Sequence, residues 1–346
     1  MARRGGGRAT VRDIAADAGV SIATVSRVLN DSEDVAPPTR DLVLAAIERL
    51  GGLAPVPRAR RNRIAEGAVY VHCPYVLSDY FGLIVSSVAE TLDLHGRRLL
   101  LNAGEAAQRK AVLPGLSLMS GVAGAIMLLP PEPSEQLLAL RGSGFPFVVI
   151  DPRTNLPRDI AAVSAAHFTG ARRLTQHLLE LGHRRIGIIA GPGNWLAADA
   201  RRAGHAAALA EVGVLTPPAL IRSGEPTTEE GFRLATELLG LPDRPTALIG
   251  FNDKMAVGAM SAAARLGLRV PQDLSVAGFD DIDLARATRP LLTTVRQPLE
   301  EMGRMAVTLL MRLLERHQLE ALHVELATEL IVRDSTAPAP TPASPV

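Results

Sequence analysis

From residue 68 onward the chain alternates short apolar runs with longer amphipathic segments, and this rhythm restricts the fold more than any other feature. The expected buried strands are AVYVHC, RLLLN, VAGAIMLL, FPFVVID, RIGIIAG, TALIGF and LSVAGF. Helical periodicity marks segments between them, including 79–95, 167–181, 196–212, 229–239 and 254–266. Strands that alternate with helices predict parallel sheets with crossover helices. Because the strands are too many for one compact sheet and the series pauses between 151 and 167, we predict two doubly wound lobes.

The first fifty residues predict a separate unit that is wholly helical. Thr10 and Asp13 can form a capping box for a helix that Gly19 ends. Ser21 can cap a second helix, IATVSRVLN, whose β-branched residues and serines make it intrinsically weak. Two short helices joined by a turn containing glycine are typical of a helix-turn-helix. A third helix, PPTRDLVLAAIERLG, would bury one face made by Val43, Ala46, Ile47 and Leu50.

A weak second helix is understandable if it rests on its neighbours and presents its outer face to DNA. Val25, Val28 and Leu29 can face inward, and short side chains on the other face let the backbone approach a major groove about 12 Å wide. Hydroxyls suit phosphate oxygens, and an arginine suits guanine or phosphate. The residues left to face a ligand are Ser21, Ile22, Ala23, Thr24, Ser26 and Arg27. The alternative interpretation is a small helical cap or a protein-docking module.

Charge and cysteine usage favour the DNA interpretation and a reducing compartment. Residues 1–63 hold eleven Arg against seven Asp and Glu, whereas the remainder holds 26 basic and 29 acidic residues. A basic end on a mildly acidic body indicates a polyanion-binding segment. The single cysteine, Cys73, excludes an internal disulfide. With no secretory signal and no run long enough to span a bilayer, we expect a cytoplasmic protein that is nucleoid-associated when bound to its operator.

Longer motifs resemble a known family. ATVRDIAADAGVSIATVSRVLND, LTQHLLELGHRRIGIIAGP, PDRPTALIGFNDKMAVGAM and GLRVPQDLSVAGFDDIDLA resemble, in order, bacterial transcription regulators of the lac repressor type (LacI/GalR). The resemblance covers most of the chain from residue 10 to about 330. It implies a helix-turn-helix headpiece at 9–54, a hinge linker at 55–67, and a core at 68–334 whose two lobes resemble periplasmic sugar-binding proteins. The composition of residues 335–346, STAPAPTPASPV, predicts a disordered tail.

For DNA, the resemblance assigns the reading of base edges to Ile22, Ala23 and Arg27. Ile22 and Ala23 lack hydrogen-bonding side chains, so they would make apolar contact, for instance with a thymine methyl. The other predicted DNA contacts in the headpiece are Thr10, Ser21, Thr24, Ser26 and Asn30.

The linker departs from the family pattern. Pro57 falls inside the expected hinge helix, and the position of the leucine that wedges into the minor groove falls at or near Arg61. Either Arg58, Arg60 and Arg61 enter a narrow minor groove, or the linker stays disordered and only attracts phosphates. We favour the second interpretation and expect weaker DNA bending than in typical relatives.

The resemblance also implies a ligand between the lobes, beyond the carboxyl ends of the strands. The predicted ligand contacts are Asp79, Tyr80, Phe81, Trp195, Arg201, Asn252 and Asp280. Asp253 is expected instead to cap its helix. Two departures, Ala166-His167 in place of an Asp-Asn pair and Pro226 in place of a common aromatic residue, argue against a conventional hexose.

Other signals are weak. Gly191-Pro192-Gly193 lacks the third glycine of a dinucleotide fingerprint, and His72 and Cys73 point to opposite faces of a strand, so we expect neither a nucleotide cofactor nor a metal. No catalytic elbow is recognisable, which indicates a protein that is not an enzyme. We predict a homodimeric, sequence-specific repressor of a palindromic operator, modulated by a small polar effector. The alternatives are a DNA-binding regulator whose cleft no longer responds to a ligand and, less favoured, a plain solute-binding protein.

Overall fold

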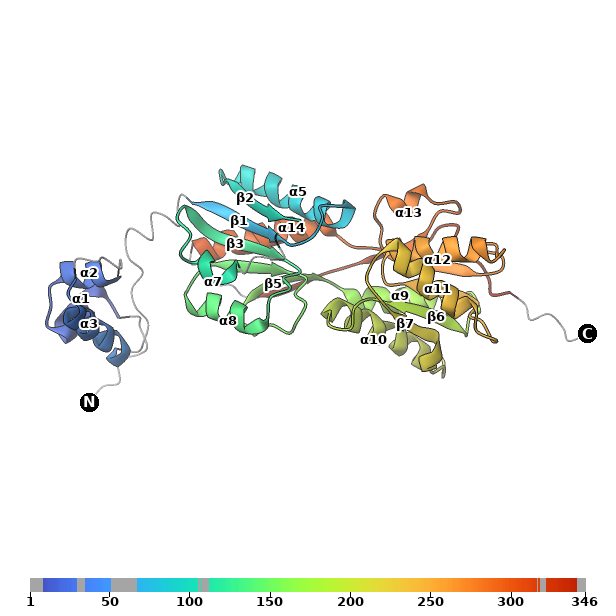
Figure 1. Ribbon diagram of the computed structural model, residues 1–346, viewed down its shortest axis with the longest axis horizontal. Coiled ribbons are helices and arrows are strands. Elements are labelled where there is room, and N and C mark those ends of the chain that lie inside the picture. The colour runs from blue at the N-terminus through green and yellow to red at the C-terminus, as the bar shows by residue number, and fades with distance from the viewer. Residues whose placement is uncertain are drawn as a thin grey trace, which may run out of the picture. The chain divides into compact units, whose positions relative to one another are not determined.

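The computed structural model describes residues 9–29, 35–50, 67–104, 107, 112–315, 317 and 322–340. The chain divides into two compact units, an N-terminal helical headpiece and a larger α/β core (Figure 1). Asn30 and linker residues 55–66 lie outside the described residues, so the predicted hinge stays a prediction.

The headpiece contains the three predicted helices, α1 (Val11–Ala18), α2 (Ile22–Leu29) and α3 (Pro37–Arg49). The capping box of α1 is confirmed: Asp13 N–H donates to Thr10 Oγ1 at 3.2 Å, and Thr10 N–H donates to the Asp13 carboxylate at 2.8 Å. Gly19 ends α1 in the left-handed region, with φ of 67°. A side chain at that backbone angle is disfavoured, which explains a glycine between the two helices.

The second helix is held mainly by tertiary packing. Ser21 Oγ accepts the N–H of Thr24 at 3.0 Å and so caps α2. Val25 and Val28 are buried with Ile14 in the small headpiece core. Leu50, expected on the same face of the third helix as Val43, Ala46 and Ile47, instead lies after the last turn of α3 and is 36% exposed.

The core has two lobes, each built on a six-stranded sheet. The N-lobe sheet has the order β11-β5-β4-β3-β1-β2, and the C-lobe sheet has the order β12-β10-β9-β8-β6-β7. The pairs β1–β2, β3–β4, β4–β5 and β5–β11 are parallel in the first sheet. In the second sheet only the β10–β12 pair is antiparallel among the registers described. The prediction of two doubly wound parallel lobes is confirmed.

The strands are short, as parallel strands in small lobes usually are. In the N-lobe they are β1 (Ala68–Cys73), β2 (Leu99–Ala103), β3 (Val122–Leu128), β4 (Phe147–Ile150), β5 (Ala161–Ala165) and β11 (His323–Leu326). In the C-lobe they are β6 (Ile186–Ala190), β7 (Ile221–Ser223), β8 (Ala247–Gly250), β9 (Ser275–Asp280), β10 (Thr293–Arg296) and β12 (Glu329–Ile331).

Helices cover both faces of each sheet (Figure 1). The N-lobe helices are α5 (Asp79–Leu94), α7 (Leu113–Leu116), α8 (Ser134–Gly142) and α14 (Leu299–Leu314). The C-lobe has α9 (His167–Glu180), α10 (Leu196–Glu211), the 3-10 turn η1 (Pro218–Leu220), α11 (Thr228–Leu239), α12 (Asp253–Arg265) and α13 (Leu284–Ala287). In the C-lobe, α9 and α10 share one core cluster with the sheet, and α11 and α12 share the other.

The chain passes between the lobes three times, and the crossings lie beside one another. They follow β5 at Ala166, β10 at Gln297 and β11 at 327–328. Ala166 N–H donates to the Leu326 carbonyl at 2.8 Å, which ties the first crossing to the third. The second crossing is tied to the end of β9, because Gln297 N–H donates to the Asp280 carbonyl at 3.3 Å.

Two predictions about the core are corrected by the structure. The apparent pause between 151 and 167 contains β5, a buried strand whose small residues, AAVSA, give only a weak strand signal. The predicted disordered tail starts too early, because residues 335–340 pack on the C-lobe. Ser335 is buried and exchanges hydrogen bonds with Val276, and His183 contacts the Ala337 carbonyl at 3.0 Å.

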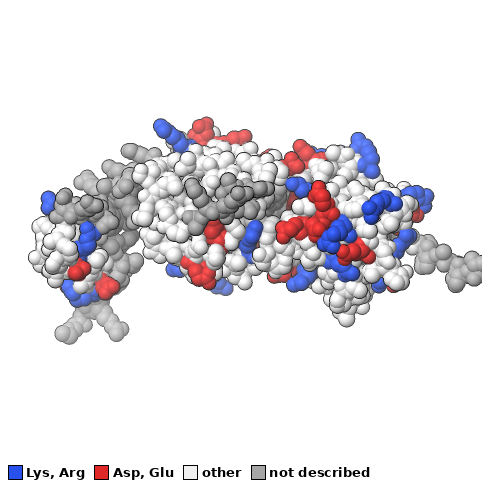
Figure 2. Space-filling model, viewed as in Figure 1, with Lys and Arg blue, Asp and Glu red and all other residues white. Residues whose placement is uncertain are grey.

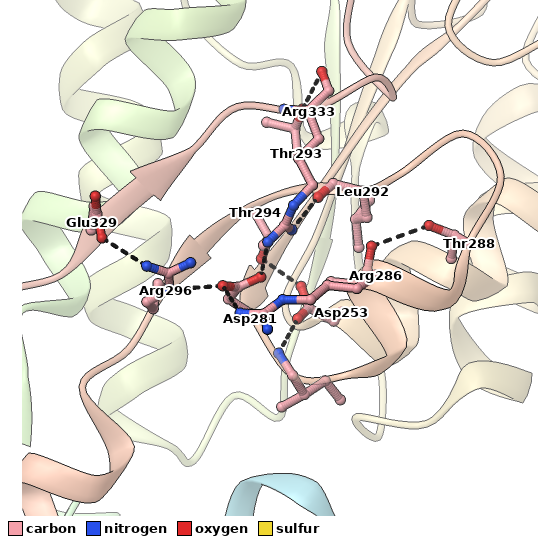
Figure 3. A network of polar contacts seen from close by, with 12 residues as sticks. Asp253, Asp281, Arg286, Thr288, Leu292, Thr293, Thr294, Arg296, Glu329 and Arg333 are labelled. Atoms are coloured by element: carbon pink, nitrogen blue, oxygen red, sulfur yellow. Dashed lines mark hydrogen bonds and ion pairs between the residues drawn. The ribbon is translucent and has the colours of Figure 1, made fainter.

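An ion-pair network fixes the C-terminal segment to the sheet (Figure 3). The buried Asp281 carboxylate follows β9 and accepts hydrogen bonds from Arg333, from Arg296 at 2.8 Å and from Arg286 at 3.3 Å. Burial raises the pKa of Asp281, but the hydrogen bonds from Arg333 and Arg296 outweigh it, and the net pKa lies below the ordinary value. Arg296 also reaches Glu329 at 3.1 Å. One carboxylate therefore joins three segments that are distant in sequence.

Replacing Asp281 with Asn is expected to lower the free energy of unfolding by about 3 kcal/mol, because arginine charges lose a buried partner. The matched control is Asp273→Asn, whose ion pair with Arg269 also measures 2.8 Å but lies on the surface. Exposed pairs contribute little, so the control should unfold close to wild type. Urea unfolding followed by Trp195 emission measures both; equal losses would contradict this role for Asp281.

Candidate functional site

The predicted DNA-contacting face is exposed in the headpiece. Ser21, Ile22, Ala23, Ser26 and Arg27 are exposed on α2, and Thr24 is half-buried. Thr10 is also exposed, at the start of α1. Val25, Val28 and Leu29 of α2 are turned toward the headpiece core. The exposed side chains therefore form one outer face. The remaining predicted DNA contacts, Asn30, Arg58, Arg60 and Arg61, lie outside the described residues.

The described part of the core presents no continuous basic surface on the face seen in Figure 2, because its acidic and basic side chains are interspersed there. Many charged side chains of the core are paired with each other, for example Arg222 with Glu237 at 3.0 Å and Arg233 with Glu230 at 2.8 Å. Interspersed charges do not attract a polyanion as a basic face would.

The core holds a cavity between the carboxyl ends of its two sheets. Six of the seven predicted ligand contacts line it, and Asp79 does not, because its side chain is exposed at the start of α5. The lining residues are Ser78, Tyr80, Phe81, Leu129, Asp151, Trp195, Ala197, Arg201, Pro226, Phe251, Asn252, Lys254, Asp280 and Ile282.

A chain of buried polar groups crosses from one lobe to the other at this cavity. Asp151, after β4, accepts from Tyr80 Oη at 2.6 Å and lies 3.1 Å from His167 Nε2. On its other side, His167 Nδ1 lies 3.4 Å from an Arg201 Nη atom, and that guanidinium lies 3.6 Å from Asp280. A carboxylate accepts and a guanidinium only donates. His167 therefore lies between an acceptor, Asp151, and a donor, Arg201, and links the two lobes.

The two cavity carboxylates have opposite pKa shifts. Burial raises the pKa of Asp151, but the charge and hydrogen bond of His167 and the hydrogen bond of Tyr80 outweigh it, so the net pKa is lowered. Burial also raises the pKa of Asp280, to about 6, against the attraction of Arg201 and the hydrogen bond from Gln297 Nε2. Asp151 is thus a fixed anion at neutral pH, whereas Asp280 can take up a proton under mild acid.

Asn252 takes the capping role that the sequence assigned to Asp253. Asn252 Oδ1 accepts the N–H of Met255 at 2.9 Å and is the true cap of α12, while Asn252 also lines the cavity. Asp253 is fully buried, and its carboxylate accepts from Ile282 N–H at 3.0 Å and from the Thr294 hydroxyl. The prediction that Asp253 caps its helix is wrong, because both of its oxygens bind the loop after β9 and strand β10.

Aromatic rings and one arginine form the apolar side of the site. Tyr75 and Phe81 stack with ring centroids 4.4 Å apart, and Trp195 meets Tyr75 edge-on at 6.5 Å. The Arg153 guanidinium lies over both Tyr75, at 5.5 Å, and Trp195, at 4.9 Å. Phe81 and Trp195 also line the cavity, so two of these aromatic rings are available to a ligand.

Two further contacts join the lobes around the cavity. Lys254 Nζ, on α12, donates to Ser78 Oγ, before α5, at 3.3 Å. The Arg153 carbonyl, in the loop after β4, accepts the N–H of Leu196 at 3.1 Å. These two contacts hold the lobes together beside the cavity.

The backbone is strained where the strands end at the cavity. Positive φ angles occur at Leu129 (45°), Asp151 (46°), Asp280 (117°) and Asp281 (57°), all just after or at the ends of β3, β4 and β9. Non-glycine residues rarely adopt such angles, and they persist mainly where the surrounding structure enforces them, often at binding sites. Here the enforced angles aim Asp151 and Asp280 toward the cavity.

Sequence reasoning missed several of these residues as site members. Asp151 stands at a predicted strand end, and His167 is a departure from a family pair, so both carried a signal. Arg153 and Lys254 carried no sequence signal, because their contacts with Trp195 and Ser78 come from the opposite lobe.

The comparisons with known proteins agree with this geometry. Residues 10–51 match the model described as bacterial regulatory proteins, lacI family, and residues 175–336 match a periplasmic binding protein-like domain. The HTH-type transcriptional repressor CytR of Escherichia coli strain K12 is 34% identical, over 96% of this chain and 97% of CytR. The chain belongs to the LacI family.

Other LacI-family relatives extend the comparison. The transcriptional repressor PurR of Escherichia coli strain ATCC 8739 is 33% identical, over 96% of this chain and 98% of PurR. The solved structure of a CelR–cellobiose complex superposes with a TM-score of 0.71 at 32% identity, over 95% of this chain and all of that one. Like the repressors it resembles, this LacI-family chain is a DNA-binding transcriptional regulator and not an enzyme.

The described residues contain neither a candidate metal site nor a candidate membrane-spanning helix. Within the described ranges no three His, Cys, Asp or Glu side chains gather in a way that could hold a metal ion. None of the helices described is both long and apolar enough to cross a membrane.

Replacing His167 with Ala is expected to lower the free energy of unfolding by about 2 kcal/mol, because the buried Asp151 loses a donor and Arg201 loses an acceptor. His167→Gln keeps one N–H donor and one carbonyl acceptor and should recover most of the loss. Urea unfolding reports stability, and acrylamide quenching of Trp195 emission reports opening of the cavity, expected for Ala only. Identical behaviour of the two variants would argue against the bridging role.

Proposed function

We propose that this chain is a homodimeric repressor whose affinity for a palindromic operator is set by a small polar effector bound between the lobes. The observation that carries the proposal is the pairing of an exposed recognition face on α2 with a buried, charged cavity in the core. A regulator needs both a surface that reads DNA and a second site whose occupation changes that reading.

A second copy of the chain is the natural partner. One headpiece reads only one half-site, and symmetric dimers match palindromic DNA. The N-lobe supplies a surface for pairing: Leu83 and Leu94 on α5, and Leu100 and Leu101 on the edge strand β2, are large apolar side chains left exposed. Exposed apolar residues around an unpaired strand edge are typical of a surface that is covered in the assembled protein.

The cavity favours an effector rich in hydroxyl groups. Arg201 Nε is buried at the cavity, has no hydrogen-bond partner among the described residues, and can donate to a ligand oxygen. Asp280 offers an acceptor beside it, and a hydroxyl can satisfy both groups because it donates and accepts. Trp195 and Phe81 can pack on the flat side of a sugar or a base. The CelR structure is described with cellobiose, and another LacI-family structure with ribose.

A regulator that ignores effectors is the second candidate, and one observation favours it. Both oxygens of Asp151 are already bonded, to Tyr80 and His167, and the lobes already touch through Lys254 and Ser78. A cavity in which both oxygens of Asp151 are already bonded offers a ligand fewer polar partners. We place either form in the bacterial cytoplasm, where the chromosome is, with double-stranded DNA as its partner.

Arg27→Ala is expected to weaken operator binding tenfold or more and to relax base preference at one position, because an arginine contact to a base contributes about 1–3 kcal/mol of discrimination. Arg312→Ala, an exposed arginine on α14, removes the same charge from the core and should leave the affinity unchanged. Selection of an operator from random duplexes by the full chain, followed by footprinting, measures both. Unchanged footprints for Arg27→Ala would exclude it as a base reader.

Effector binding should weaken in acid. The pKa of Asp280 is about 6 because burial disfavours its charge, so at pH 5 about nine-tenths of it is protonated and no longer accepts from a ligand hydroxyl. Ribose, cellobiose and adenosine are titrated against Trp195 emission at pH 7.5 and pH 5. A probe that binds should lose affinity about tenfold between them.

Asp280→Asn is the control for this titration and should bind the same probe with no dependence on pH between 5 and 7.5. If no probe changes the emission of Trp195 at millimolar concentration, the second candidate, a cavity that no longer responds, is favoured.

A further inference from the structure

The first turn of α2 presents DNA with an apolar group in an otherwise polar setting. Ile22 is the first residue of α2 and is 52% exposed, whereas the other large apolar residues of α2 pack on the headpiece core. Its neighbour Ala23 is exposed and adds only a methyl group. Within the described headpiece, the core is complete without Ile22, so the side chain is not held there by packing.

The hydroxyls beside Ile22 are engaged with each other. Ser21 Oγ and Thr24 Oγ1 hydrogen-bond at 2.8 Å, and Ser21 Oγ also accepts the N–H of Thr24 at 3.0 Å. These bonds form the helix cap, so both hydroxyls already have partners before any base arrives. The first turn therefore offers the methyl groups of Ile22 and Ala23 beside two hydroxyls that are already engaged in the helix cap.

The N-terminal residues of a recognition helix face the base edges in the major groove. The only apolar group that a base pair exposes there is a methyl on C5 of a pyrimidine, as in thymine. We propose that Ile22 reads this C5-methyl, and that the operator is recognised at that position by a methyl group instead of a hydrogen-bond pattern. This rests on the proposed function of α2 as the recognition helix.

One consequence separates this mode of reading from hydrogen-bond readout. A methyl reader cannot distinguish thymine from 5-methylcytosine by the contact it makes, because both carry the same C5 group. Methylation of cytosine at that position therefore strengthens binding, and DNA methylation becomes an input to this regulator. A reader that used the thymine O4 or the adenine amine would instead reject 5-methylcytosine and accept uracil.

The test starts from the operator that the full chain selects from random duplexes. At each thymine of a half-site, duplexes carrying thymine, uracil, cytosine or 5-methylcytosine are compared for affinity. At one position per half-site, uracil should bind about fourfold more weakly than thymine, and cytosine about fourfold more weakly than 5-methylcytosine, as expected for one buried methyl. Substitution in both half-sites should give about the square of that factor.

Two variants assign the effect to the side chain. Ile22→Ala should bring both ratios below about twofold, because the truncated side chain no longer reaches the methyl. Leu42→Ala is the matched control: Leu42 is 53% exposed on α3, and its loss should leave both ratios as in the wild type.

Each result tests either the methyl contact of Ile22 or the role of the chain as a regulator. Equal affinity for thymine and uracil at all positions, a selected operator with no thymine, or ratios that persist in Ile22→Ala would each overturn it while leaving the regulator role intact. Failure to select any preferred sequence would instead overturn the proposed function on which it rests.

Discussion

The core depends on burying ionised groups in such a way that each one is paired. A lone carboxylate or guanidinium inside a protein is strongly disfavoured, whereas a hydrogen-bonded set is tolerated. Asp151, His167, Arg201 and Asp280 form such a set, with consecutive contacts of 3.1, 3.4 and 3.6 Å. Because the members come from both lobes, the arrangement of the lobes is part of what keeps the charges satisfied.

In the headpiece, a few side chains stabilise a helix that is weak on its own. Its second helix is poor in intrinsic propensity, and its stability comes from Val25, Val28 and the cap at Ser21. This leaves the outer face free to be chosen for what it contacts. The C-lobe uses the opposite strategy at Asp281, where three arginines and one buried carboxylate connect the segment after β9, strand β10 and the C-terminal segment (Figure 3).

Sequence predicted the elements whose pattern is strong and missed those that depend on distant partners. The apolar run at 68–73 matches β1, and the predicted helix 196–212 differs from α10 by one residue. Strand β5 was missed because its alanine and serine residues give little sequence signal for a strand. Burial in the folded lobe nevertheless makes this segment a strand. The tail prediction failed at Ser335, because composition cannot show that a hydroxyl will find a buried backbone partner in β9.

The cavity residues show the same difference between residues that lie in sequence motifs and residues that depend on distant partners. Arg201, Asn252 and Asp280 lie in motifs and were predicted, whereas His167 acquires its role from Asp151 and Arg201, which are 16 and 34 residues away. His167 begins α9 directly after one interlobe crossing, and Gln297 sits at another, where its side chain donates to Asp280 at 2.6 Å.

Each cavity carboxylate is thus bonded to a residue at a crossing between the lobes. A ligand changes a conformational equilibrium only if it interacts differently with the two states. If the proposed effector competes for Asp151 or Asp280, it alters the bonds at the crossings, and its binding and the lobe arrangement then form one coupled equilibrium.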